Sequence, residues 1–149
     1  MHNPILFSGL LGWFLAQILK TLFHAIKINK VDFQRFVGAG GMPSSHTALV
    51  SATLINTGRT EGINSPLFGI AFVVTAVVIY DAMTVRLQAG LHARELNIIN
   101  KTLIKNKSPE NQNSENKIKE FNEFLGHTPI EVVGGAVVGI VAALLIPRK

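Results

Sequence analysis

Two histidines lie in polar stretches that each open an apolar helical pattern, and the first is in "GGMPSSH", residues 40–46. The glycines allow tight turns. Pro43 suits the first turn of a helix, and Ser44 or Ser45 suits its N-cap. The free N–H groups and positive dipole end of such a helix form an anion site, with His46 beside it. The alternative is an ordinary N-cap with a bystander histidine.

The second histidine, His127, lies in "LGHTPIEVVGG" and is followed four residues later by Glu131. On a helix this spacing places the two side chains on one face. A carboxylate one turn from an imidazole can hold its tautomer and stabilise its cation. The pair therefore predicts an oriented imidazole.

Polar residues also interrupt the first apolar block. Gln17, Lys20, His24 and Lys27 recur every three or four residues, which predicts one polar stripe that faces inward. Lys20 is too deep in the block to lack an anion or carboxylate partner. The alternative is a snorkelling lysine.

Asp81 and Arg86 lie near the end of another apolar block. They are five residues apart and so not strictly on one face, although the long arginine side chain can compensate; a structural ion pair is the alternative. Two histidines, a carboxylate, two cations and a row of N–H donors together describe a site that handles phosphate.

The composition indicates what kind of chain carries this site. It has 149 residues, a net charge of +5 and no cysteine, which suggests one domain without disulfides or thiolate ligands. A basic balance can indicate nucleic-acid binding, but 48% of the residues are hydrophobic and only 15% are charged. The apolar residues form long blocks, so we predict a membrane protein with basic loops and no nucleic-acid partner.

We predict an all-α, integral membrane helical bundle with about four spans, near residues 4–26, 44–58, 66–87 and 129–146. A helix needs about 20 apolar residues to cross a bilayer, and the block at 44–58 is only moderately apolar. Residues 4–26 lack the basic start and cleavage site of a signal peptide, so we expect them to be retained.

Positive charges in the loops predict the orientation. If all four blocks cross, ten lysines and arginines lie on one side and three on the other. The ten-residue side holds residues 27–43, Arg86 and the polar segment 88–127, which the positive-inside rule places in the cytoplasm. We expect the plasma membrane, with the site facing the cytoplasm.

The segment 88–127 has a loop-like middle, "NKSPENQNSEN", between two flanks with helical spacing. We predict that both flanks are amphipathic helices that pack on the bundle or lie on the membrane surface. Their apolar positions are Leu96, Ile99 and Leu103 in the first flank, and Ile118, Phe121 and Leu125 in the second.

The chain resembles the divergent branch of the type 2 phosphatidic acid phosphatases, which are related to vanadium-dependent haloperoxidases. The resemblance rests on Gln17 with Lys20, "GGMPSSH", "YDAMTVR" and "LGHTPIEV", and it covers nearly the whole chain. It implies hydrolysis of a lipid phosphate or diphosphate by a covalent mechanism without metal or cofactor.

The resemblance also implies roles for single residues. His127 resembles the histidine nucleophile that forms a phosphohistidine, with Glu131 in place of the aspartate that orients it. His46 resembles the general acid that protonates the leaving alcohol and then activates water. The predicted phosphate-binding residues are Lys20, Ser44, Ser45 and Arg86, and the predicted supporting residues are Gln17 and Asp81.

The chain departs from typical superfamily members in three respects. No Arg-Pro follows Lys20, no Ser-Arg precedes His127, and about four spans replace a core of six helices. Arg86 would have to supply the missing guanidinium from another helix. Either a homo-oligomer or the amphipathic segments would have to complete the packing.

Three functions stay open at this point. The first is a membrane phosphatase for a lipid phosphate or diphosphate, acting through phosphohistidine. The second is a non-enzymatic membrane protein that binds or moves an anionic lipid, which the missing arginine motif favours. The third is a small structural membrane subunit, for which the glycines of "GGAVVGIV" offer a packing surface.

Overall fold

The computed structural model describes residues 3–28, 41–105, 120–121, 123 and 125–147. Within these ranges every regular element is an α-helix, which confirms the predicted all-α fold class. The helices are α1 (Pro4–Ile28), α3 (Ser45–Glu61), α4 (Pro66–Met83), α5 (Val85–Lys105) and α6 (Pro129–Leu145).

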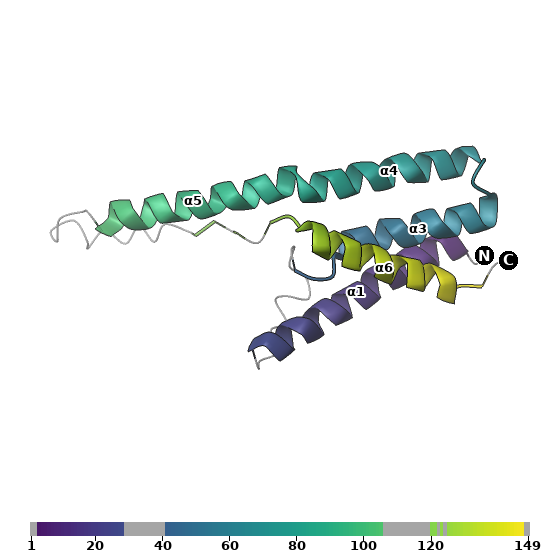
Figure 1. The fold of residues 1–149 in the computed structure, drawn as a ribbon, viewed down its shortest axis with the longest axis horizontal. Coiled ribbons are helices and arrows are strands. Elements are labelled where there is room, and N and C mark those ends of the chain that lie inside the picture. The colour runs from purple at the N-terminus through teal and green to yellow at the C-terminus, as the bar shows by residue number, and fades with distance from the viewer. Residues whose placement is uncertain (1–2, 29–40, 106–119, 122, 124, 148–149) are drawn as a thin grey trace.

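Four of these helices form a bundle in which α1 and α4 run toward the end where α3 and α6 begin, while both chain termini lie at the opposite end (Figure 1). The second half of α1, the last turn of α4 and the first turns of α3 and α6 are therefore near one end of the bundle. This is the end that carries the residues singled out in the sequence.

Helix α3 is the central helix and packs against α1, α4 and α6. Its buried face consists mainly of small and polar side chains, including Thr47, Ala48 and Asn56. Asn56 donates from Nδ2 to the carbonyl of Pro4 at 2.6 Å, which satisfies part of this buried amide. The moderate apolarity of α3 follows from this position, because its neighbours are protein helices.

Small residues let α6 approach α3 closely. A Cβ atom at Gly135 would overlap the backbone carbonyl of Ser44, and one at Gly139 would overlap that of Ala48. The two glycines are four residues apart and so share one face of α6. This small-xxx-small spacing is a common way for helices to pack in membranes, where lipid provides no hydrophobic force between them.

The outer surface of the bundle is apolar. Large side chains such as Phe14 on α1, Val73 on α4 and Val137 on α6 are about half exposed or more. In the described part of the chain, α1 and the long helical stretch that begins with α4 are long and apolar enough to cross a membrane, and α6 is apolar but shorter. The number of spans stays a prediction.

The local starts of α3 and α6 are set by their caps. Ser44 is the N-cap of α3, and its Oγ accepts the N–H of Thr47 at 3.3 Å. The prediction that Pro43 occupies the first turn is wrong, because that residue precedes the cap. In α6, by contrast, a proline does begin the helix, at Pro129.

The apolar block predicted at 66–87 contains a helix boundary. Helix α4 ends at Met83, and Thr84 closes it by donating both its N–H (3.0 Å) and its hydroxyl (2.6 Å) to the carbonyl of Tyr80. Helix α5 continues in nearly the same direction and extends well past the bundle (Figure 1). Leu96, Ile99 and Leu103 lie on α5 as predicted and are exposed.

The second flank of the polar segment is not a helix in its described residues, so that prediction is wrong; Ile118 lies outside them. The side chain of Asn97 on α5 accepts the N–H of Phe121 and donates to its carbonyl, both at 2.9 Å. Asn97 also donates to Glu123 at 2.8 Å. These bonds satisfy backbone groups that a helix would otherwise pair internally, so an extended segment can lie along α5.

Candidate functional site

The two histidines singled out in the sequence meet at the bundle end. His46 lies in the first turn of α3, and His127 lies two residues before α6. Their ring centroids are 6.3 Å apart and the ring planes are tilted by 56°. Two imidazoles at this separation can both contact one small group placed between them.

His127 is held by several bonds. Its Nδ1 lies 3.1 Å from Oε2 of Glu131, so the predicted pair forms, although His127 precedes the N-cap Thr128 and is not itself in the helix. Its backbone N–H donates to the carbonyl of Ala82 on α4 at 2.9 Å. The ring is 3% exposed, so it is buried and oriented, and the Nδ1 contact leaves Nε2 as the nitrogen available for chemistry.

Glu131 also stabilises the start of α6. The same Oε2 accepts the N–H of Thr128 at 3.0 Å, which satisfies one of the free donors of the helix. Its backbone carbonyl accepts the N–H of Ser44 at 3.0 Å and so joins the starts of α3 and α6. One residue thus orients His127, caps its own helix and ties the two helix starts together.

Gly126 lets the chain dock against the junction of α4 and α5. Its φ is +83°, and a Cβ atom there would overlap the backbone of Leu87. A side chain would meet both a strained backbone and a filled space. The glycine is therefore needed to bring His127 beside Arg86, which directly precedes Leu87.

Arg86 and Asp81 form an ion pair at the same place. Nε of Arg86 lies 2.6 Å from Oδ2 of Asp81, with the side chains 51% and 36% exposed. The five-residue spacing is bridged across the boundary between α4 and α5. The carboxylate takes Nε, so the terminal nitrogens of the guanidinium can still bind an anion.

A cavity of about 220 Å³ joins these groups. Its polar lining comes from His46, His127, Asp81 and Arg86, and the rest of its lining consists of Val77, Val78, Ala82 and Gly126. Four of the predicted site residues therefore face one space, and they come from α3, α4, the start of α5 and the segment before α6.

Besides Glu131, four predicted residues are not among those that line the cavity. Lys20 is 3% exposed and lies close to Gly41, where a Cβ atom would be 3.5 Å from its Cγ. Ser44 and Ser45 are buried at the start of α3, and the hydroxyl of Ser44 is engaged as the N-cap. Gln17 is also buried, and its Oε1 has no hydrogen-bond partner among the described residues.

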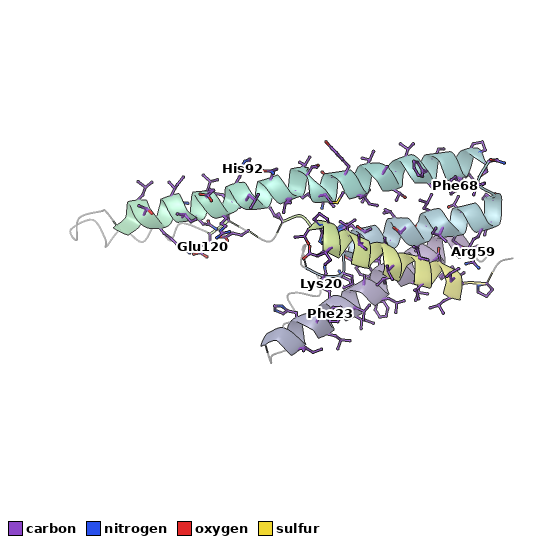
Figure 2. The ribbon with its side chains drawn as sticks, in the orientation of Figure 1. Lys20, Phe23, Arg59, Phe68, His92 and Glu120 are labelled. Carbon is purple, nitrogen blue, oxygen red and sulfur yellow. The ribbon has the colours of Figure 1, made fainter. Side chains whose placement is uncertain are left out.

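The rest of the predicted stripe on α1 is less buried. In Figure 2, Lys20 lies on α1 near the end of the bundle that carries the cavity, and Arg59 lies near the other end. His24 is partly exposed, and the side chain of Lys27 lies outside the described residues. The structure therefore places two members of the stripe, Gln17 and Lys20, inside the bundle.

Burial lowers the pKa of His127 below its ordinary value of 6.5. The hydrogen bond and charge of Glu131 oppose this shift, while the charges of Lys20 and Arg86 add to it. The balance keeps the ring neutral near pH 7, which is the form that can act as a nucleophile. Among the described residues, no cluster of three histidines or carboxylates is arranged to hold a metal ion.

Sequence reasoning missed three parts of this site. Gly126 could have been noticed, because it directly precedes His127 in "LGHTP". The carbonyl of Ala82 and the side chain of Asn97, which hold the segment before α6 against α4 and α5, gave no local signal. Their roles depend on contacts between residues 24 or more positions apart.

Fold and composition together define an all-helical membrane protein with a polar site at one end of the bundle. The chain belongs to the Divergent PAP2 family, whose family model matches residues 1–142, so the resemblance noted in the sequence is confirmed. It is also 32% identical over 150 residues to the uncharacterized membrane protein YuiD of Bacillus subtilis (strain 168). That match covers 98% of this chain and 95% of YuiD, and no solved structure matches the chain.

Proposed function

We propose that this protein is a membrane phosphatase that hydrolyses a lipid phosphate or diphosphate through a phosphohistidine intermediate. The observation that carries the proposal is the cavity in which His46, Arg86 and a Glu131-oriented His127 meet. Membership of the Divergent PAP2 family supports the same reaction class.

In the first step, Nε2 of His127 attacks phosphorus as the bond to the leaving alcohol oxygen breaks. Glu131 accepts the Nδ1 proton in a hydrogen bond, which directs the Nε2 lone pair outward and stabilises the cation that forms. His46, which lines the same cavity and begins this step as the imidazolium, donates its proton to the oxygen of the leaving alcohol.

In the second step, His46 takes a proton from water, whose oxygen attacks phosphorus as the bond to His127 breaks. Inorganic phosphate leaves and both imidazoles return to their starting state. Atoms and charge therefore balance with water as the only co-reactant, and no metal or cofactor enters the scheme.

Positive charge near the cavity supports phosphoryl transfer, in which charge spreads over the equatorial oxygens. Arg86 lines the cavity, and Lys20 is close enough to influence the pKa of His127. The first turn of α3 adds the positive end of a helix dipole. Lys20 and Arg86 would thus supply the positive charge that additional arginines supply in typical members of the superfamily.

The wall formed by Val77 and Val78 supports a lipid substrate. The cavity is lined both by charged or polar side chains and by apolar side chains, which suits a molecule with a phosphate head and a hydrocarbon chain. The site lies at the ends of apolar helices, where a head group would be found. The excess of positive loop charges supports the cytoplasmic face of the plasma membrane.

One observation favours a second candidate, a protein that binds or moves an anionic lipid without hydrolysing it. Arg86 is already paired with Asp81, and the arginine motifs of typical superfamily members are missing. Such a protein would use the same cavity to hold a head group.

The test is phosphate release from a panel of lipid phosphates and diphosphates by the purified protein in detergent. We expect turnover, inhibition by vanadate, and an acid-labile label on His127 after quenching with labelled substrate. His127→Ala should abolish both turnover and label. Full activity in this variant would overturn the mechanism, and head-group binding without release would favour the second candidate.

A further inference from the structure

A second hollow lies farther along the bundle. It has a volume of about 330 Å³ and lies between α1, α3 and α4. Its lining includes Ile5 on α1, Val50 and Thr53 on α3, and Leu67, Ala71 and Val74 on α4. We call this hollow the α3–α4 groove.

The α3–α4 groove begins one helical turn from the histidine cavity on both helices. On α3, His46 lines the cavity and Val50 lines the groove. On α4, Val78 lines the cavity and Val74 lines the groove. Residues four apart share one face of a helix, so the two hollows follow each other along one interface.

The groove is chemically apolar even though threonines line it. Thr53 donates its hydroxyl to the carbonyl of Leu49 at 2.9 Å, and Thr57 donates to that of Thr53 at 2.8 Å. Thr75 donates to the carbonyl of Ala71 at 2.7 Å. These hydroxyl protons are used within the helices, so the groove presents mainly carbon to a ligand.

The length of the groove matches part of a lipid chain. Leu67, Ile70 and Val74 line the groove, recur every three or four residues on α4 and are each more than half exposed. From Leu67 to Thr75, the first and last groove residues on α4, the eight steps span about 12 Å at 1.5 Å per residue. The groove therefore covers less than half of a hydrocarbon core of roughly 30 Å and lies along the half of α4 farther from the histidine cavity, so it accommodates the distal part of one long lipid chain.

We propose that the α3–α4 groove binds the hydrocarbon chain of the lipid phosphate whose head group occupies the histidine cavity. This inference rests on the proposed function for the identity of the head group. It adds that the protein selects its ligand by one long chain, held along α4 from the histidine cavity toward the end of the bundle where α4 begins.

A binding measurement tests the groove without requiring turnover. The probe is a long-chain alkyl phosphonate, which cannot be hydrolysed at its P–C bond, with a diazirine at the chain end. After irradiation in detergent micelles, we expect mass spectrometry to find the label near Ile5, Thr53 and Leu67. Excess unlabelled alkyl phosphonate should compete, and an alcohol of the same chain length should compete poorly.

Paired variants locate the chain. Ala71→Leu and Thr53→Leu fill the groove from opposite walls, whereas Ala76→Leu adds the same atoms to an exposed position on α4 that does not line it. Displacing about two methylene groups should weaken long-chain binding about tenfold in the groove variants. Ala76→Leu should bind as the parent does, and thermal unfolding should show that all three variants are folded.

The outcomes separate this inference from the proposed function. Competed labelling in the groove without any phosphate release would support the chain site and argue against the phosphatase. Phosphate release together with equal long-chain binding in all three variants would support the phosphatase and overturn the chain site. Labelling spread over the outer faces of α1, α4 and α6, without competition, would mean annular lipid only and would overturn the chain site.

Discussion

His46 and His127 are 81 residues apart in the chain, yet their ring centroids lie 6.3 Å apart with the planes tilted by 56°. His127 is oriented by Glu131, whereas His46 lines the same cavity from the first turn of α3 and makes no contact with that carboxylate among the hydrogen bonds of the described residues. This asymmetry suits different roles for the two rings, and the following predictions test it.

His46→Ala should separate the two steps of the reaction. With a substrate that has an activated leaving group, attack by His127 needs no proton donor, but transfer to water becomes slow. The phosphoenzyme should therefore accumulate and be detected as acid-labile label. The control is His92→Ala, because His92 is exposed on α5, away from the bundle (Figure 2). A His46→Ala protein with unchanged turnover would remove this residue from the mechanism.

Glu131→Gln should lower the rate more than it lowers stability. The amide oxygen can still accept the N–H of Thr128, but the charge that stabilises the imidazolium is lost. By analogy with other carboxylate–imidazole pairs, kcat should fall by up to about four orders of magnitude. Kinetics and thermal unfolding should be compared with Glu61→Gln, an exposed position at the other end of α3. Equal kcat in both variants would contradict the assigned role.

The stability of the protein should fall as the pH drops below about 6.5. The folded-state pKa of His127 is lowered from 6.5, so the unfolded chain binds a proton first as the pH falls. Unfolding then becomes more favourable until the pH passes the folded-state pKa. At higher pH neither state is protonated, and this contribution is constant.

This pH dependence is measured by thermal unfolding in detergent between pH 5 and pH 8, around the reference value of 6.5. His127→Gln should reduce the slope, whereas His92→Gln should keep it. An unchanged slope in His127→Gln would assign the effect to other groups.

Gly139→Ala should destabilise the packing of α3 against α6. The added Cβ would overlap the carbonyl of Ala48, and overpacking of this kind costs about 1–3 kcal/mol. The matched control is Gly69→Ala on α4, where a Cβ meets nothing within 4 Å. The midpoint of thermal unfolding should fall only in the first variant, and equal midpoints would contradict this packing.

The orientation is tested by cysteine labelling in intact cells, since the chain has no native cysteine. Asn64→Cys lies between α3 and α4, and Asn113→Cys lies in the polar segment, outside the described residues. An impermeant reagent applied from outside should label Asn64→Cys and spare Asn113→Cys, because the more basic side remains in the cytoplasm. The opposite pattern would reverse the topology.

Local patterns in the sequence determined much of the fold. Apolar blocks predicted the helices, because backbone groups in lipid must be paired within the segment. The cap at Ser44 and the pair of His127 with Glu131 were also readable, since both depend on spacings of three or four residues. The helical prediction for the segment around Phe121 failed because Asn97, on another element, satisfies its backbone.

Only the tertiary structure decided which local features meet. Close contact at Gly135 and Gly139 sets α6 against α3, and the bond from His127 to the carbonyl of Ala82 sets the ring beside Arg86. Helical periodicity specifies which residues share a face of one helix, but not which face of another helix lies opposite. That choice depends on packing and on backbone bonds between distant segments, and here it determined the cavity between the two imidazoles.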